Sequence, residues 1–104
     1  MIRAKIIQAE GLILGFECRG HAGYAEEGSD IICAAVSILV TTCANALESV
    51  AGTEANARVD DGYMQVLLEK EKASRDTQVI FQTILQGLRD LEEAYPEYLQ
   101  LKEN

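Results

Sequence analysis

The feature that most constrains the fold is an apolar segment that starts at Ile31. Its large apolar residues recur at spacings of three and four, which is typical of an α-helix: Ile32, Val36, Leu39, Cys43, Leu47 and Val50. The remaining sides of this helix are also fairly apolar, with Ala34, Ala35, Ile38 and Val40. A helix that is apolar nearly all round is buried on more than one side. We therefore expect a sheet on one side of it and a second helix or another subunit on the other.

This segment does not predict a membrane protein. The apolar run from Ile31 to Ala46 is short for a membrane span and contains Ser, Thr, Cys and Asn. Residues 1–8 lack the apolar core and the small-residue cleavage site of a signal peptide. A cytoplasmic protein is therefore expected. The three cysteines, an odd number with no CxxC pair, predict free thiols rather than a disulfide framework or a zinc site.

The rest of the chain predicts strands and one more helix. Four segments have the Ile-rich or alternating pattern of strands and form two hairpins: residues 2–8, 12–18, 54–59 and 63–69. Glu10–Gly11 and Asp61–Gly62 suit the two turns. A second helix is capped by Ser74 or Asp76 and ends at Pro96. Its expected buried face contains Ile80, Ile84, Leu88, Leu91 and Tyr95.

These elements predict an α+β fold in a single domain over residues 1–104. The order is ββαββα, and a four-stranded sheet built from the two hairpins is covered on one face by the two helices. The order of the strands within the sheet does not follow from the pattern. The length of 104 residues suits one domain with one core.

The acidity of the chain restricts its partners. A formal charge of −8 argues against nonspecific DNA or RNA binding, which depends on Lys and Arg contacts to phosphate. It also argues against docking on anionic lipid. A basic protein or peptide suits the charge better, because complementary charge speeds encounter. A merely solvated acidic surface would have the same composition.

The candidate chemistry lies in the loop from Gly20 to Ser29. This loop carries His21, the only histidine of the chain, and Cys33 follows twelve positions later. If the helix begins at Ser29 or Asp30, Cys33 lies in its first turn, where unpaired N–H groups and the helix dipole favour a thiolate. A loop folded back onto the helix would make His21 and Cys33 a nucleophile and base pair. The N–H groups at the helix start would then be available for a developing oxyanion.

Each candidate has a plainer interpretation. Asp30 either orients the imidazole as a third member or simply caps the helix, and Ser37 either lines the site or bonds a carbonyl of its own helix. Cys33 itself is a packed thiol in the plainer reading, with His21 solvated. Phosphatase and sulfurtransferase loops fit worse, because the sequence after Cys33 is already helical in pattern. A redox sensor lacks a resolving cysteine beside Cys33.

The stretch GHAGYAEEGSDIICAAVSILVTTCANALE, residues 20–48, resembles the signature of the bacterial ribosomal-processing cysteine protease family. The likeness extends over nearly the whole chain, to a last helix that ends in YPEYL. It implies that His21 is the catalytic histidine and Cys33 the nucleophile, in a homodimer of α+β subunits. It also implies the reaction, which is removal of a short N-terminal extension from large-subunit ribosomal protein twenty-seven. Cleavage would follow an aromatic pair and precede a small residue.

The loop is expected to cover the substrate. Its candidate residues are Gly20, Ala22, Gly23, Tyr24, Glu26, Glu27, Gly28 and Ser29. Glycines supply hinges, and Glu26 and Glu27 face either water or basic residues that follow the cleavage site. A thiol mechanism needs no metal or cofactor. The alternative from a different class is a non-catalytic, ribosome-associated module that binds a basic protein tail.

Overall fold

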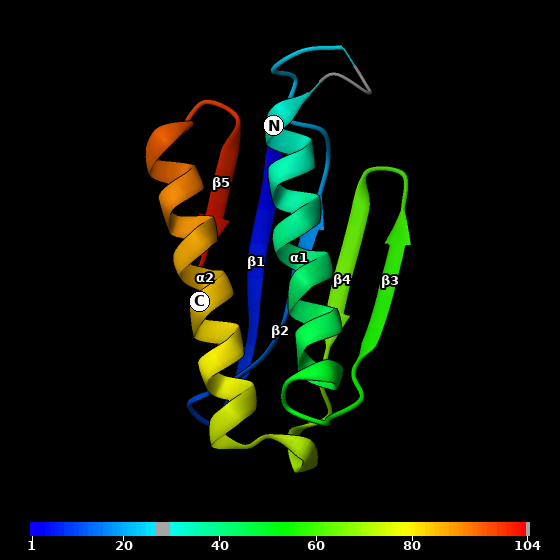
Figure 1. Cartoon of the computed structure of the whole chain (residues 1–104). Helices are drawn as coiled ribbons and strands as arrows, with labels where there is room; N and C mark the ends of the chain where they lie inside the picture. The colour runs from blue at the N-terminus through cyan, green and yellow to red at the C-terminus, as the bar shows by residue number, and fades with distance from the viewer. Residues whose placement is uncertain (27–29, 104) are drawn as a thin grey trace.

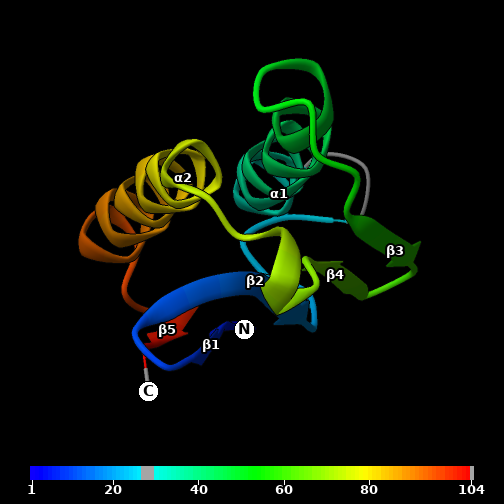
Figure 2. The same cartoon turned by 90° about the horizontal axis from the view of Figure 1, so that it is seen from below.

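The computed structural model describes residues 1–26 and 30–103 as a two-layer α+β sandwich (Figure 1). The elements in chain order are β1 (Ile2–Ala9), β2 (Leu12–Arg19), α1 (Ile31–Ser49), β3 (Asn56–Asp60), β4 (Tyr63–Leu67), the short 3₁₀ helix η1 (Lys70–Lys72), α2 (Arg75–Ala94) and β5 (Leu99–Lys102). The strands form one sheet in the order β3-β4-β2-β1-β5. Both helices lie on the same face of this sheet, side by side (Figure 2). The two-layer arrangement predicted from the sequence is therefore confirmed.

The sheet has five strands, so the prediction of a four-stranded sheet is wrong. The extra strand β5 follows α2 and pairs in parallel with β1, with Ile2 opposite Leu99. The N–H of Ile2 also donates to the carbonyl of Tyr98 at 2.9 Å. With only four residues, β5 is at the lower limit of length at which alternation indicates a strand. It becomes a strand because α2 returns the chain to the open edge of β1.

The two hairpins form as the turn residues predict. Glu10 and Gly11 have φ angles of 53° and 79°, and Gly62 has a φ of 69°, so all three adopt the left-handed conformation that tight hairpin turns need. Pairing of β2 with β4 joins the hairpins into one sheet. Gly15 is required at this junction, because a Cβ atom there would collide with the carbonyl oxygen of Val66.

Helix α1 buries one stripe against the sheet and α2. Its buried residues are Ile32, Val36, Val40, Cys43 and Leu47. Three positions differ from the predicted stripe. Val40, which the pattern placed on another side of the helix, is only 3% exposed and belongs to the buried stripe. Leu39 is half-buried against Gly87 of α2. Val50 is 73% exposed because it is the C-cap residue, beyond the last turn. The helix is long and apolar enough to cross a membrane, but its stripe packs here as that of a core helix does.

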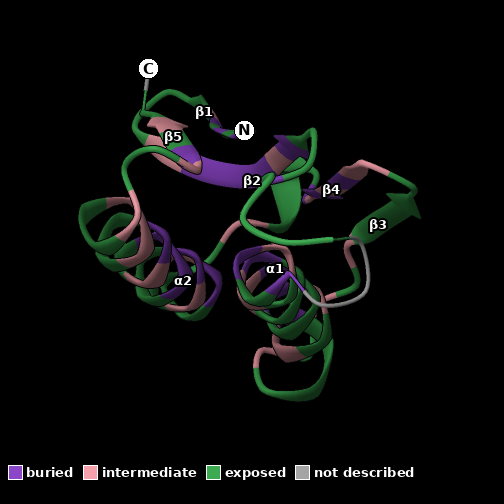
Figure 3. Ribbon diagram, turned by 90° about the horizontal axis from the view of Figure 1, so that it is seen from above, coloured by how far each residue is buried: buried purple, intermediate pink, exposed green. Residues whose placement is uncertain are grey.

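The core lies between the helices and the sheet. Phe16 of β2 and Phe81 of α2 meet edge to face at its centre, with ring centroids 5.8 Å apart. Ser74 caps α2 through a reciprocal capping box with Thr77, as one of the two predicted caps. Figure 3 shows the buried surfaces of both helices turned toward the sheet, whereas β3 is exposed along its whole length. Strand β3 is therefore an open edge beside α1.

Candidate active site

The start of α1 is fixed by Asp30. Its carboxylate accepts hydrogen bonds from the N–H groups of Ile32 at 2.9 Å and Cys33 at 3.0 Å, so it is the N-cap of the helix. The other carboxylate oxygen accepts from the N–H groups of Tyr24 at 3.0 Å and Ala25 at 3.4 Å. One side chain thus ties the histidine-bearing loop to the first turn of α1.

This bonding shows Asp30 as the cap of the helix and explains its pKa. Burial by itself would raise the pKa of Asp30, but the four backbone N–H bonds outweigh it and hold the pKa below its ordinary value. Within the described residues, Asp30 has no hydrogen bond or ion pair with the His21 ring. The geometry shows a helix cap, and a role as third catalytic member stays a prediction. The expectation of unpaired N–H groups at the helix start is wrong for Ile32 and Cys33, since both already donate to Asp30.

Cys33 lies in the first turn of α1, where the sequence predicts it, and is half-buried. The N–H of Ala22 donates to its Sγ atom at 3.3 Å, and Ala22 itself is only 3% exposed. An N–H donor and the positive end of the helix dipole therefore both lie next to the sulfur. The loop thus contributes directly to the environment of the sulfur.

His21 is half-exposed and lies against the turn between β3 and β4. Its Nε2 atom is 3.6 Å from Oδ1 of Asp61. A Cβ atom on Gly62 would come within 3.1 Å of the same Nε2, so a glycine leaves room for the ring. The N–H of Gly20 donates to the carbonyl of Gly62 at 2.8 Å and holds the loop to this turn. No hydrogen bond joins the His21 ring to the Cys33 thiol in the part of the chain described.

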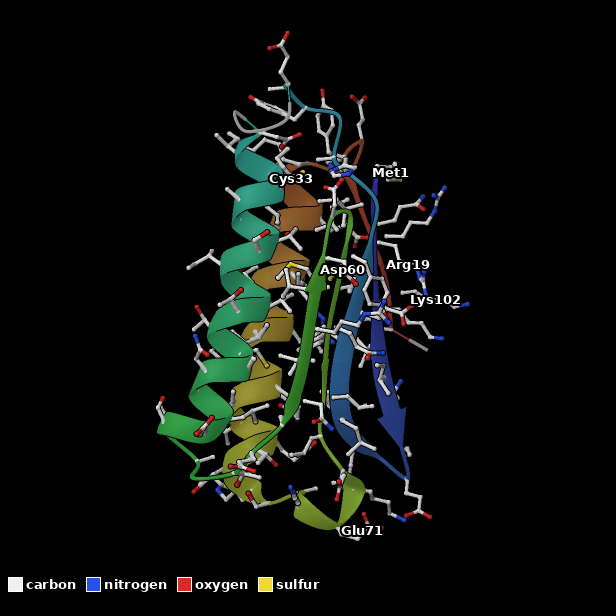
Figure 4. All side chains as sticks on the ribbon, turned by 90° about the vertical axis from the view of Figure 1, so that its right-hand side faces the viewer. Met1, Arg19, Cys33, Asp60, Glu71 and Lys102 are labelled. Carbon is white, nitrogen blue, oxygen red and sulfur yellow. The ribbon has the colours of Figure 1, made fainter. Side chains whose placement is uncertain are left out.

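A cavity of about 420 Å³ brings these groups together. Cys33 and Ser37 line it from α1, His21 from the loop, and Val59 and Asp61 from the second hairpin. It lies at the end of α1 that carries Cys33, which is also the end of the molecule where Met1 lies (Figure 4). A peptide that enters this cavity would therefore contact both the thiol and the imidazole.

The hairpin contribution to the cavity was missed by sequence reasoning. Asp61 and Gly62 were interpreted only as turn residues, because nothing local in a DDG sequence indicates a distant histidine. Their proximity to His21 follows from the pairing of β2 with β4, in which Arg19 is opposite Tyr63. Ser37, by contrast, is exposed and lines the cavity, which is one of the two interpretations that the sequence offers for it.

The loop from Gly20 to Glu26 is anchored at several points. The ring of Tyr24 packs edge-on against Tyr95 and Tyr98, with centroid distances of 5.9 and 5.2 Å. Gly23 has a φ of 73°, which favours glycine, and Glu26 is exposed. The loop candidates Glu27, Gly28 and Ser29 lie outside the described residues.

The other two cysteines are buried. Cys18 is 4% exposed and Cys43 is fully buried, and burial raises the pKa of each thiol to about 12. All three cysteines are free thiols, as expected. In the described ranges no group of three or more His, Cys, Asp or Glu side chains could hold a metal ion.

Within this α+β sandwich, the Cys33 thiol at a helix start and the His21 ring line one cavity. This arrangement defines a candidate cysteine hydrolase. The family described as Cysteine protease Prp matches residues 1–100, and the chain belongs to this family of cysteine proteases. The chain is 31% identical over 110 residues to the ribosomal processing cysteine protease Prp of Bacillus subtilis, covering 100% of this chain and 98% of the relative. It is 29% identical to Prp of Staphylococcus aureus, with 91% of each chain covered.

Solved structures agree with this assignment. The crystal structure of SMU.848 from Streptococcus mutans superimposes with a TM-score of 0.87 at 38% identity, over 99% of this chain and 93% of that one. The structure of the essential ribosomal processing protease Prp from S. aureus, in complex with a covalently linked product peptide, has a TM-score of 0.89 at 29% identity over 100% of both chains. The fold described above is therefore that of the family.

Proposed function

We propose that this protein is a ribosomal-processing endopeptidase that uses Cys33 as nucleophile and His21 as acid and base. The observation that carries the proposal is the shared cavity, in which a thiol at a helix start and an imidazole face the same space. Relatives over the full length are named as ribosomal processing proteases, and one of them is covalently linked to a product peptide in its structure. For the substrate we propose the precursor of large-subunit ribosomal protein twenty-seven, whose short N-terminal extension is removed.

The reaction proceeds by acyl transfer. The Cys33 thiolate attacks the scissile carbonyl carbon, and the His21 imidazolium gives its proton to the leaving amine as the C–N bond breaks. The neutral imidazole then takes a proton from water, and the resulting hydroxide attacks the thioester. The carboxylic acid product leaves, and thiolate and imidazolium are restored. Every group in this cycle belongs to the chain, the substrate or water, so no cofactor is needed.

The surroundings of the cavity suit a basic substrate. Oδ1 of Asp61 lies 3.6 Å from Nε2 of His21, at the rim of the cavity. Asp60 and Asp61 on the hairpin, and the exposed Glu26 on the loop, put negative charge near the cavity. A precursor rich in Lys and Arg would be attracted to this end of the molecule. The loop from Gly20 to Glu26 would form the cover over the bound peptide.

We further propose a cytoplasmic homodimer. Its interface would be the side of α1 that faces away from the sheet, where Ile31 is 54% and Ile38 is 64% exposed. Large exposed apolar side chains on a single helix are typical of an interaction surface. Sedimentation of wild type should give a dimer, and Ile38→Asp should give a monomer. Val79→Asp, at an exposed apolar residue of α2, should leave the dimer intact.

Incubation with a peptide that carries the extension tests the proposed function. Mass spectrometry should show two fragments, cut after the aromatic pair and before the small residue. A peptide that binds but stays intact would instead favour a binding module for a basic tail. A peptide of the same composition in scrambled order is the control, and equal cleavage of both would contradict a processing role.

A further inference from the structure

The sheet has an uncovered face on the side away from the helices, here called the outer face. Its side chains alternate with the buried residues of the strands, as Arg3 and Lys5 alternate with Ile2, Ala4 and Ile6 of β1. Five of the nine lysines and arginines of the chain lie on this face: Arg3, Lys5, Arg19, Arg58 and Lys102. Figure 4 shows Arg19 and Lys102 projecting from it, among many nitrogen atoms on that side.

The outer face has the opposite charge to the rest of the protein. Glu17 and Asp60 are the carboxylates of the strand residues that lie on it, so its five cations leave a net charge of +3. The rest of the sequence has four cations and fifteen carboxylates, a net charge of −11. The overall charge of −8 therefore conceals a separation of charge between the two sides of the sheet.

The cations on the outer face are placed against one another. Arg3 is directly opposite Arg19 on β2, and Lys5 is directly opposite Lys102 on β5. Like charges in directly opposed positions destabilise a sheet. An anion bound between them would reduce this repulsion.

The carboxylates of the outer face do not neutralise these pairs. Glu17 is 3.0 Å from Arg19, and Asp60 is 2.9 Å from Arg58. Glu17 is also opposite Lys5 in the strand register. The hydrogen bond from Arg19 and, less strongly, the charge of Lys5 lower the pKa of Glu17, but the side chains of Glu17 and Lys5 lie beyond ion-pair distance. In the part of the chain that is described, Arg3, Lys5 and Lys102 have no carboxylate within ion-pair distance. These three form the part of the outer face that is open to an external anion.

The composition of the outer face favours a phosphate polymer over an acidic protein. Protein interfaces have an apolar core with aromatic anchors. The exposed large apolar residues of the described chain lie on the loops, the helices and the helix side of β3 instead: Met1, Tyr24, Ile31, Ile38, Val50, Val59 and Val79. On the outer face the ring of Tyr63 is covered by the guanidinium groups of Arg19 and Arg58, at 4.7 and 5.3 Å.

We propose that the outer face binds the phosphate backbone of RNA, without reading its sequence. The charge of the whole chain does not prevent this. Salt screens charges beyond about 8 Å at physiological ionic strength, and the smallest extent of the Cα trace is 17 Å. The acidity of the whole surface still argues against binding by its other sides. RNA binding goes beyond peptide cleavage, and the three open cations, Arg3, Lys5 and Lys102, do not line the cavity of Cys33 and His21.

Fluorescence anisotropy with a labelled uridine homopolymer tests the proposal. The variant Arg3→Gln, Lys5→Gln, Lys102→Gln removes the three open cations, and Lys70→Gln, Lys72→Gln, Arg75→Gln removes the same charge elsewhere. Wild type should bind at physiological ionic strength, where the charges of the other sides are screened, and the affinity of the outer-face variant should fall by about tenfold or more. The slope of log affinity against log salt should decrease by about 2, since each phosphate contact contributes about 0.7 for a single strand. The matched variant should keep most of the affinity.

Three results would overturn the proposal. The first is that wild type binds no RNA at physiological ionic strength, and the second is that the two triple variants lose affinity equally. The third is that polyglutamate of equal charge displaces the RNA as well as unlabelled RNA does, which would assign the face to an acidic protein. Circular dichroism and cleavage of the precursor peptide, measured on the same samples, show whether each variant is folded. They also separate a failure of RNA binding from a failure of the proposed proteolysis.

Discussion

Two cysteines line the same cavity, and the structure gives them opposite properties. Cys18 lies inside β2, is 4% exposed, and has a thiol pKa raised to about 12 by burial and then by the charge of Glu17. Cys33 lies at the start of α1, is half-buried, and accepts the N–H of Ala22 on its sulfur. The difference shows that access to a cavity does not make a thiol reactive. At the start of α1 the sulfur lies near the positive end of the helix dipole and accepts an N–H from the loop. Inside a strand, the backbone N–H groups are used by the pairing of the sheet.

The rates at which the three cysteines are alkylated test this difference most strongly. At about pH 7.5, a thiol with a pKa of about 12 is ionised in fewer than about 1 in 10,000 molecules, so Cys18 and Cys43 should hardly react. Iodoacetamide should modify Cys33 more than about 100-fold faster than either of them. Peptide mapping after brief labelling gives the order. Labelling of Cys18 or Cys43 ahead of Cys33 would show that the assignment of the thiols is wrong.

Replacing the histidine should have the next largest effect. His21→Ala should slow peptide cleavage by about 100-fold or more, which is the usual contribution of a positioned acid and base. Asp61→Asn keeps the histidine and removes only the neighbouring charge, so its loss of activity should be much smaller. Steady-state cleavage rates compare the two. If His21→Ala cleaves at the parental rate, His21 is only a solvated loop histidine, as in its plainer interpretation.

The cap of α1 can be compared with the cap of α2. Asp30→Ala should cost about 1–2 kcal/mol in the free energy of unfolding and should also slow alkylation of Cys33, because the loop and the first turn lose their common acceptor. Ser74→Ala removes the cap of α2 and should cost about 1 kcal/mol without changing the alkylation rate. Denaturant unfolding and labelling are measured on both. Equal labelling in the two variants would mean that Asp30 acts only on stability.

Asp30 should also make stability depend on pH. Its pKa in the folded protein lies below the ordinary value of 3.8, so the carboxylate stabilises the fold fully above that value. This contribution is lost as the pH falls through the lower folded pKa. Wild type should therefore be more stable than Asp30→Asn at neutral pH, and the two should converge in acid. A constant difference between them down to low pH would contradict the ionised cap.

The smallest effect should come from Cys43, which is far from the chemistry. Cys43→Ala opens a small gap in the core and should cost about 1 kcal/mol of stability while the cleavage rate stays at the parental value. Thermal unfolding and the peptide assay are sufficient measurements. A large loss of activity at unchanged stability would mean that the core behind α1 controls the site.

Local patterns were sufficient for most of the fold and for part of the site. The stripe of α1, the turns at Gly11 and Gly62 and the caps at Asp30 and Ser74 all follow from interactions between residues close in sequence. The signature around His21 and Cys33 points to the same two side chains that line the cavity.

What the sequence could not predict depends on pairing between distant segments. Strand β5 exists because Leu99 meets Ile2 across nearly the whole chain. Asp61 reaches His21 only through the pairing of β2 with β4. The cations of the outer face are likewise brought together by strand register, which a count of total charge does not contain.

The most direct test of the account compares cleavage by three enzymes: wild type, Cys33→Ala and Cys18→Ala. Alanine is favourable in a helix, so Cys33→Ala should fold as the parent does. Mass spectrometry of the precursor peptide should show two fragments with wild type and Cys18→Ala and only intact peptide with Cys33→Ala. Fragments at the parental rate from Cys33→Ala, or their loss in a folded Cys18→Ala, would contradict the central claim that the thiol at the helix start carries the chemistry.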